Sequence, residues 1–187
     1  VKDEPLENYK VGADGYSVEG PTNWYNSYKG SMSLPDAIEI SSNATAAQVM
    51  DQITPQAAYK QVTQLMGFKH LDEKDGQEVG ALSIGGMTGG VTAREMAAAY
   101  QYLGNGGQYY EPYTYYYVTD NDDKIIIDKR DKLPIQAYSD ETAAIMKRAL
   151  NFNITNSRNT QAFNAKLDGW DIIGKKGKTN DDKDSWF

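Results

Sequence analysis

The order of its secondary-structure patterns constrains the fold of this chain more than any other feature. Segments with helical periodicity fill much of the first part of the sequence, and segments rich in β-branched and aromatic residues gather later. The two patterns do not alternate regularly, as they would in a doubly wound parallel sheet. We therefore predict an α+β fold.

Local signals mark the ends of the predicted helices. Ser33 caps the first helix, where Pro35 is tolerated in the first turn and Asp36 can reach back to the cap. Thr92 caps a later helix, with Glu95 three residues on. The expected helices cover Leu34–Ile40, Ala44–Ile53, Pro55–Met66, Thr92–Leu103 and Asp140–Phe152.

Strand signals gather in the second half of the chain. A hairpin is expected from Tyr109–Thr119 and Lys124–Asp128, which flank a turn at Asn121-Asp122. A short strand is expected over Trp170–Lys175, and another begins at Trp186-Phe187 after a charged turn at residues 180–184. Residues 1–32 lack lasting periodicity and are expected to be ordered loop, with turns at 12–16 and 20–24.

Length and composition favour a single domain. The chain has 187 residues, of which 40% are hydrophobic, enough for one sizeable core. We expect one partial domain over residues 1–187, with a loop-rich lead-in at 1–32, a helical region at 33–108 and a hairpin, a helix and a strand at 109–187.

Charge and the absence of cysteine exclude several kinds of function. The net charge of -7 gives no support for nucleic-acid binding. Without cysteine there are no disulfides, thiolate zinc sites or cysteine nucleophiles, and the redox compartment stays open. No apolar run is long enough to span a bilayer and the first residues do not resemble a signal peptide, so any membrane anchor is expected outside this chain.

Two short motifs far apart in the sequence carry the chemistry. Ser41-Ser42-Asn43 lies at a break between two predicted helices, and Lys175-Lys176-Gly177 lies on the predicted late strand. Serine acyltransferases of the penicillin-binding and β-lactamase type use S-x-x-K, then S-x-N, then K-T-G, in that order. Each tripeptide alone recurs by chance, so the surrounding sequence has to support the match.

That surrounding sequence resembles the transpeptidase domain of class A penicillin-binding proteins. The resemblance is carried by Ala81–Gly86, Gly90–Tyr100, Gly104–Gly107 and Pro112-Tyr113, and by Gly174–Phe187, which is similar to the family pattern Gly-Lys-Thr-Gly-Thr-Thr-Asn-Asp-x-Lys-Asp-Ala-Trp-Phe. It implies a penicillin-binding or serine β-lactamase-like domain, with a helical part and an incomplete antiparallel sheet. It spans most of the chain from about Pro21 and is weakest in residues 1–20 and 151–166.

The resemblance implies three catalytic residues. Ser41 would pass protons between the nucleophile and the departing amine. Asn43 would offer its amide to the peptide carbonyl of the donor strand. Lys175 would supply a positive charge that favours anionic groups and the proton relay.

Gly177, Lys178 and Thr179 are implied to bind substrate. Gly177 leaves room for an extended peptide beside the strand. The Lys178 backbone N–H would be an oxyanion donor. However, Lys176 and Lys178 stand where the family has threonines that help to hold the substrate carboxylate, so they are either point charges for that carboxylate or solvated lysines.

The nucleophile motif is absent from the chain. No serine is followed three positions later by lysine. We therefore expect this chain to be a piece of a longer enzyme, inactive alone.

Other candidate sites have simpler explanations. His70 is expected to be a surface residue, and Asp120, Asp122 and Asp123 a solvated turn, so no metal or other cofactor is predicted. The tyrosines between 109 and 117 are expected to pack against a helix, the alternative being a sugar- or peptide-binding aromatic patch.

Two hypotheses for the function follow. In the first, the parent protein is a peptidoglycan D,D-transpeptidase that cross-links stem peptides through a serine acyl-enzyme and is acylated by β-lactams. Its partners would be stem peptides and β-lactams but no nucleic acid, and it would work on the extracytoplasmic face of the bacterial cell membrane, reaching the membrane only through an anchor outside this chain. In the second, the domain keeps the fold as a non-catalytic module that binds peptidoglycan or a partner, which Lys176 and Lys178 favour.

Overall fold

The computed structural model describes residues 1–11, 17–156, 162–179 and 183–187, and it confirms the α+β fold. The expected turn at 12–16 and the central part of the expected turn at 180–184 lie outside these residues. The α-helices are α1 (Leu34–Glu39), α2 (Asn43–Ile53), α3 (Pro55–Leu65), α4 (Val79–Ile84), α5 (Ala93–Tyr100) and α6 (Asp140–Thr155). Three short 3-10 helices are η1 (Glu73–Gly76), η2 (Gln101–Leu103) and η3 (Phe163–Ala165).

The strands of the described residues form five separate antiparallel pairs. In each pair only two strands lie side by side, so the described strands form no continuous sheet over the helices. The pairs are β1 (Lys2–Asp3) with β4 (Gly30–Ser31), β2 (Leu6–Val11) with β3 (Ser17–Gly20), β5 (Gln108–Tyr109) with β8 (Ile135–Gln136), β6 (Tyr117–Thr119) with β7 (Ile125–Asp128), and β9 (Gly177–Lys178) with β10 (Ser185–Trp186).

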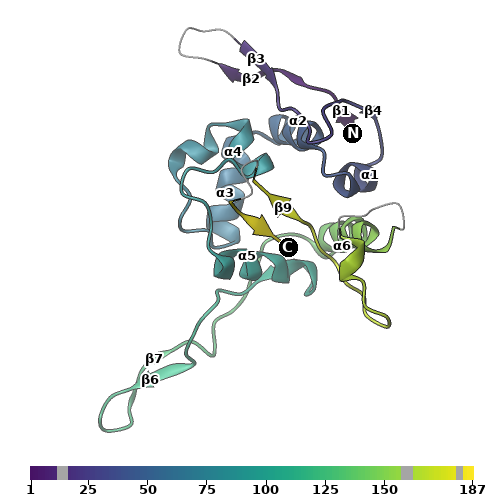
Figure 1. The fold of residues 1–187 in the computed structure, drawn as a ribbon. Coiled ribbons are helices and arrows are strands. Elements are labelled where there is room, and N and C mark those ends of the chain that lie inside the picture. Colours follow the sequence, from purple (N-terminus) through teal and green to yellow (C-terminus); the bar gives the residue numbers. More distant parts are fainter. Residues whose placement is uncertain (12–16, 157–161, 180–182) are drawn as a thin grey trace.

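The helices surround the β9–β10 pair (Figure 1). Helix α1 packs on α6 and α2 packs on α4, so helices far apart in the sequence meet in the body of the molecule. The core cluster joins the end of α3 to α5 and the β5–β8 pair. Its buried members are Met66, Phe68, Ala98, Ala99, Tyr109 and Ala137.

The predicted helix starts are confirmed by their capping contacts. The Ser33 hydroxyl accepts a hydrogen bond from the Asp36 backbone N–H at 3.2 Å. Thr92 and Glu95 form a reciprocal capping box at the start of α5. After α3, Gly67 adopts φ +70°, and the Tyr109 ring packs so closely that a side chain at Gly67 would clash with it.

The first 32 residues, expected to be loops, contain four strands. The β2–β3 hairpin pairs Leu6 with Gly20, and β1 pairs with β4 across nearly thirty residues, matching Lys2 to Ser31. Pairing over such separations depends on tertiary contacts, which sequence periodicity does not record. A strand was also expected over Trp170–Lys175, but the described strand begins at Gly177, where β10 supplies a hydrogen-bonded neighbour.

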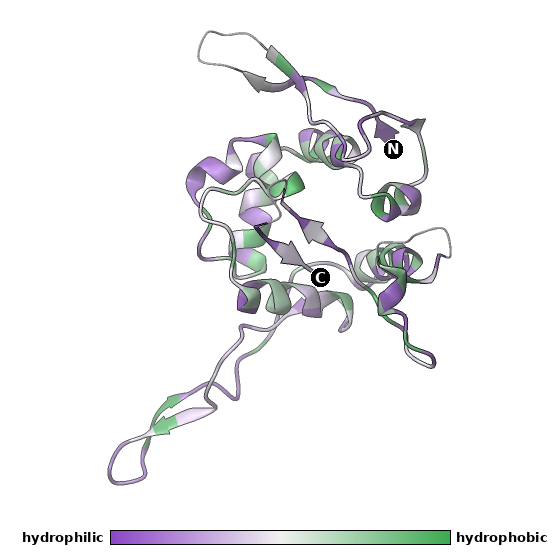
Figure 2. Cartoon of the chain, in the orientation of Figure 1, coloured by the Kyte–Doolittle hydropathy of each residue, from purple (hydrophilic) through white to green (hydrophobic). Residues whose placement is uncertain are grey.

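The tyrosine-rich segment also differs from its expected packing. Tyr109 is buried in the core as predicted, but Tyr113, Tyr115, Tyr116 and Tyr117 are exposed. They belong to an arm, residues 110–134, that projects from the body and carries β6 and β7 near its tip (Figure 1). Figure 2 shows hydrophobic residues in these strands although they lie outside the body. The prediction that the tyrosines pack on a helix is therefore wrong for this arm.

Candidate functional site

The turn between α1 and α2 places Ser41 in an unusual backbone conformation. The Ser42 N–H donates to the Ala37 carbonyl and the Ser41 N–H donates to the Ile38 carbonyl, both at 3.1 Å. This pair of bonds is a Schellman motif, which needs a left-handed residue after the helix. Ser41 takes that position with φ 56°, where glycine or asparagine is usual. Ser42 then caps α2, so two helix ends fix the backbone on both sides of Ser41.

Beneath this turn lies a buried carboxylate, Asp3. Its oxygens accept hydrogen bonds from Asn23 Nδ2 and Tyr25 OH at 2.7 Å, from Ser42 Oγ at 2.8 Å and from the Lys29 N–H at 2.9 Å. Burial raises the pKa of Asp3, but the hydrogen bonds from Tyr25, Ser42 and Asn23 and from the Lys29 backbone outweigh it and hold the pKa below its usual value. Asp3 thus ties the first strand and the loop at 23–29 to the S-x-N turn.

Sequence reasoning missed Asp3 altogether. It lies 39 residues before Ser42 and 20 residues before Asn23, and nothing in its neighbourhood resembles a capping or catalytic motif. Asn23 was noted only as part of a turn, yet its Oδ1 accepts a hydrogen bond from the Ala44 N–H at 3.1 Å, so it also holds the start of α2.

The structure brings Ser41 and Lys175 into direct contact. Lys175 Nζ donates to Ser41 Oγ at 2.7 Å across 134 residues of sequence, and it also donates to the Lys176 carbonyl at 2.8 Å. These bonds hold the ammonium on the serine hydroxyl. Because the hydroxyl oxygen accepts this bond, its own hydrogen remains available to a second acceptor.

The environment of Lys175 weakens its hold on a proton. Its side chain is half-buried and lines an apolar cavity of about 270 Å³ with Tyr100, Leu103, Met146 and other residues. Burial, with a smaller contribution from the neighbouring positive charge of Lys176, lowers the pKa of Lys175 to about 8. The ammonium is therefore mostly charged at neutral pH, but it can give up a proton more readily than an exposed lysine.

Asn43 is the first residue of α2, and its Nδ2 donates to the Thr22 carbonyl at 3.0 Å. One of its two amide hydrogens is used in this bond. It lies two residues after Ser41, at the same turn, but the structure shows no direct bond between Asn43 and Lys175 in the described residues.

The three predicted substrate-binding residues follow Lys175 on and after β9. Gly177 is exposed, and a methyl group added there would meet only the Trp186 Cβ, at 3.9 Å. Lys178 is exposed and pairs with Ser185. The Thr179 N–H donates to the Asp184 carbonyl at 3.2 Å, and its hydroxyl accepts from the Asp184 N–H at 3.1 Å, so the residue after β9 is joined to the residue before β10.

The described part of the chain holds no candidate metal centre and no candidate membrane-spanning helix. No cluster of three or more histidine or acidic side chains there is arranged to hold a metal ion. None of its helices combines the length and the apolar character needed to cross a bilayer. His70, expected to be a surface residue, has a side chain 56% exposed and lies with Nδ1 2.8 Å from Glu95 Oε1.

Comparison with known proteins gives consistent results. The chain is 31% identical over its whole length to penicillin-binding protein 1A of Clostridium acetobutylicum and 32% identical over 89% of its length to penicillin-binding protein 4 of Bacillus subtilis. It spans only 23% and 26% of these two relatives, about a quarter of each.

Solved structures show the same fold at lower identity. Penicillin-binding protein 1A from Haemophilus influenzae matches 96% of this chain, and 31% of its own chain, with a TM-score of 0.70 at 23% identity. The D,D-transpeptidase domain of a peptidoglycan glycosyltransferase from Eggerthella lenta matches 98% of this chain, and 50% of its own, with a TM-score of 0.66 at 20% identity.

The family model of the penicillin-binding protein transpeptidase domain matches residues 6–185, which include both the S-x-N turn and the K-x-G segment. The chain belongs to the penicillin-binding protein transpeptidase domain family.

Proposed function

We propose that this chain supplies the proton-relay side of the active site in a peptidoglycan D,D-transpeptidase, whose nucleophilic serine comes from an S-x-x-K motif outside residues 1–187. The observation that supports it most is the 2.7 Å contact between Lys175 Nζ and Ser41 Oγ, which joins two motifs that are 134 residues apart. Such a contact is what two groups that transfer protons together require.

In the proposed reaction, the serine Oγ bonds to the carbonyl carbon of the penultimate D-alanine of a stem peptide. The C–N bond to the terminal D-alanine breaks, and the proton of the serine hydroxyl ends on the departing amine. An amine from a neighbouring strand then attacks the ester carbonyl, the C–O bond breaks, and one amine proton returns to the serine. A β-lactam would acylate the same serine as its ring amide bond opens.

Ser41 and Lys175 act together in this scheme. With its oxygen held by the Lys175 ammonium, the Ser41 hydroxyl can donate its hydrogen to the departing amine and recover a proton through Lys175. The lowered pKa of Lys175, about 8, keeps it charged at neutral pH and still able to exchange a proton. The positive charge also stabilises negative charge that develops on the substrate.

The remaining site residues would position the peptide. Asn43 would donate to a peptide carbonyl with the amide hydrogen that Thr22 does not take. Gly177 would let the stem peptide lie along β9, because the space beside it is open. Lys178 would attract the terminal carboxylate of the peptide as a point charge, and Thr179 would add a hydroxyl at the end of the strand.

The relatives are penicillin-binding proteins and one structural neighbour is a domain of a peptidoglycan glycosyltransferase, so we expect the parent protein to work on the extracytoplasmic face of the bacterial membrane. Its ligands would be stem peptides and β-lactams.

Labelling the full-length gene product with a fluorescent penicillin tests the proposal. We expect covalent label on the wild type, and a rate lower by at least about a hundredfold in Ser41→Ala and Lys175→Met. Ser83→Ala and Lys147→Met are matched controls, because Ser83 bonds within its own helix and Lys147 pairs with Asp171 on the surface.

A wild type that takes up no label, yet still binds peptidoglycan, would overturn the proposal in favour of a non-catalytic binding module. Labelling of the Ser41 and Lys175 variants at the wild-type rate would show that the pair has no part in acylation.

A further inference from the structure

The arm carries exposed aromatic side chains that the proposed reaction does not use. All seven residues of β6 and β7 are exposed. Two tyrosine rings, Tyr113 and Tyr116, meet edge to face with centroids 5.7 Å apart, and Arg130 lies 4.6 Å from the centre of the Tyr117 ring. A two-stranded hairpin without a packed face is only marginally stable. The exposed side chains of the arm therefore contribute little to the stability of the fold.

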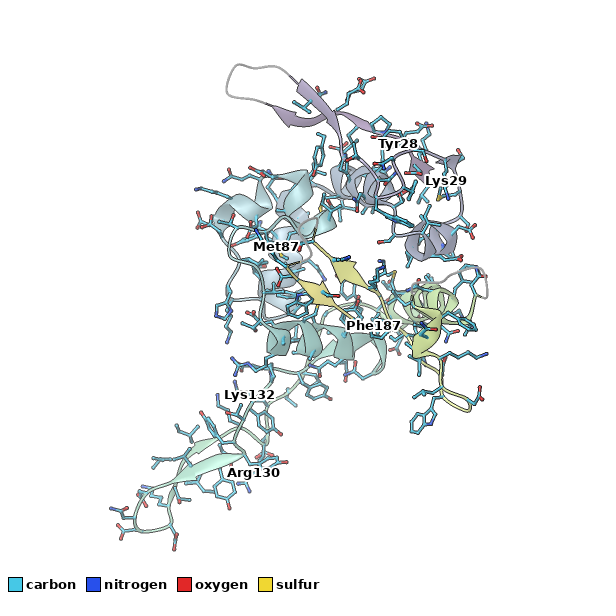
Figure 3. All side chains as sticks on the ribbon, in the orientation of Figure 1. Tyr28, Lys29, Met87, Arg130, Lys132 and Phe187 are labelled. Atoms are coloured by element: carbon cyan, nitrogen blue, oxygen red, sulfur yellow. The ribbon has the colours of Figure 1, made fainter. Side chains whose placement is uncertain are left out.

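A pocket of about 190 Å³ lies where the arm joins the body. Tyr113 and Tyr115 from the arm form part of its lining, together with Lys69 and Arg94 from the body. Figure 3 shows Lys132 beside this junction and Arg130 farther along the arm. The lining of this pocket includes neither Ser41 nor Lys175, and in Figure 1 the arm leaves the body below α5 whereas β9 lies above this helix.

The two carboxylates of this pocket are already occupied. Glu95 is buried and accepts hydrogen bonds from the Lys69 N–H at 2.7 Å, from the Thr92 N–H at 2.9 Å and from the Thr92 hydroxyl at 2.8 Å, besides its contact with His70. Glu111 pairs with Lys69 at 3.1 Å and also with Lys132.

The other charged residues of the pocket are cations. Among the described residues, neither Arg94 nor Lys129 forms an ion pair. The pocket lining thus carries three cations, Lys69, Arg94 and Lys129, against two carboxylates, in a chain whose net charge is -7. An arginine fork beside exposed rings suits a ligand that has both a carboxylate and an apolar face.

We propose that this arm-base pocket binds an acidic saccharide, with Tyr113 and Tyr115 stacking on the C–H face of a sugar ring and Arg94 binding a carboxylate of the same ligand. The identity of the saccharide rests on the proposed function: it is a stretch of peptidoglycan glycan whose muramic acid residues have lost their stem peptides, because the carboxylate is free only where no peptide is amide-bonded to it. The pocket would then hold a peptide-free stretch of glycan while a stem peptide from another disaccharide lies along β9.

The experiment measures binding of labelled, peptide-free glycan strands to the full-length protein by fluorescence anisotropy. We expect Tyr113→Ala/Tyr115→Ala to bind at least about tenfold more weakly than the wild type, a loss of about 1.4 kcal/mol, because tyrosines are enriched among the residues that dominate binding energy. Tyr110→Ala is the matched control, since Tyr110 is 44% exposed and belongs to the arm but does not line the pocket. Arg94→Gln should weaken binding and reduce its dependence on salt.

Three results would overturn the inference: no difference between the double variant and the wild type, an equal loss in Tyr110→Ala, or binding of free stem peptides to this pocket in place of glycan. Penicillin labelling is measured on the same variants and should stay at the wild-type rate. Loss of glycan binding with intact labelling in the pocket variants thus supports the pocket without testing the reaction. A wild type that takes up no label contradicts the proposed reaction without testing the pocket.

Discussion

Replacing Ser41 by glycine and by alanine separates the backbone cost of its conformation from the chemistry of its hydroxyl. Both changes remove the hydroxyl and the hydrogen bond from Lys175. Only alanine keeps a Cβ in the left-handed conformation at φ 56°. That conformation costs a residue with a Cβ about 1–2 kcal/mol, a cost that glycine avoids. Glycine also has more conformational freedom in the unfolded chain, which offsets about 0.5–1 kcal/mol of this advantage.

We therefore expect Ser41→Gly to be more stable than Ser41→Ala by about 1 kcal/mol. In urea unfolding this corresponds to a midpoint higher by roughly 0.3–1 M at an unchanged slope. Both variants should lose penicillin labelling to the same extent, because the loss depends on the hydroxyl alone.

Equal stability of the two variants would refute the assignment of backbone strain to the Schellman turn. Labelling at the wild-type rate by the more stable glycine variant would refute the assignment of the relay to the hydroxyl.

Three other predictions follow from the same structure. Asp3→Asn should lower the free energy of unfolding by about 2–4 kcal/mol at pH 7, because a buried carboxylate that accepts from four donors becomes an amide. Since the pKa of Asp3 is lowered in the fold, the stabilisation by this carboxylate is present above about pH 4 and is lost as pH falls. Urea unfolding at pH 3 should therefore show a smaller difference in stability between the variant and the wild type. The labelling rate should fall as pH rises through about 8, where Lys175 loses its proton. Lys176→Thr removes a neighbouring positive charge and should raise the pKa of Lys175, so the midpoint of this fall should move to higher pH. A midpoint that does not move would mean that another group is titrating. Gly177→Val should slow labelling by at least about tenfold while changing the unfolding midpoint little, since its side chain would enter the space for the peptide, and a fast-labelling variant would exclude that peptide path.

Most of the described α-helices could be predicted closely because their signals are local, whereas α4, which has no side-chain cap, was not predicted. Ser33, Thr92 and Ser139 each cap a helix through a contact with a residue three positions on, so a short stretch of sequence contains the whole interaction. The strands were predicted less well. Strand β1 depends on β4, which is distant in sequence, and the start of β9 depends on its pairing with β10; periodicity identifies neither partner.

The residues of the candidate site likewise divide into those marked by a sequence motif and those whose role depends on tertiary contacts. The order of the motifs, together with the surrounding sequence that resembles the family, selected Ser41 and Lys175, which the structure then brings into contact. Asp3 could not be selected in this way, because its role arises only when the first strand packs beneath the turn at Ser42. The tyrosines of the arm were misjudged because strand residues usually pack against something, and here the strands leave the body.

A double-mutant cycle on the rate of penicillin labelling tests the Ser41–Lys175 relay most directly. The rate is measured in the full-length wild type, in Ser41→Ala, in Lys175→Met and in the double variant, with circular dichroism confirming that all four are folded. If the hydroxyl and the ammonium act as one unit, the double variant should label no more slowly than the slower single variant. Losses that multiply, so that the double variant is slower by the product of the two single effects, would contradict the relay.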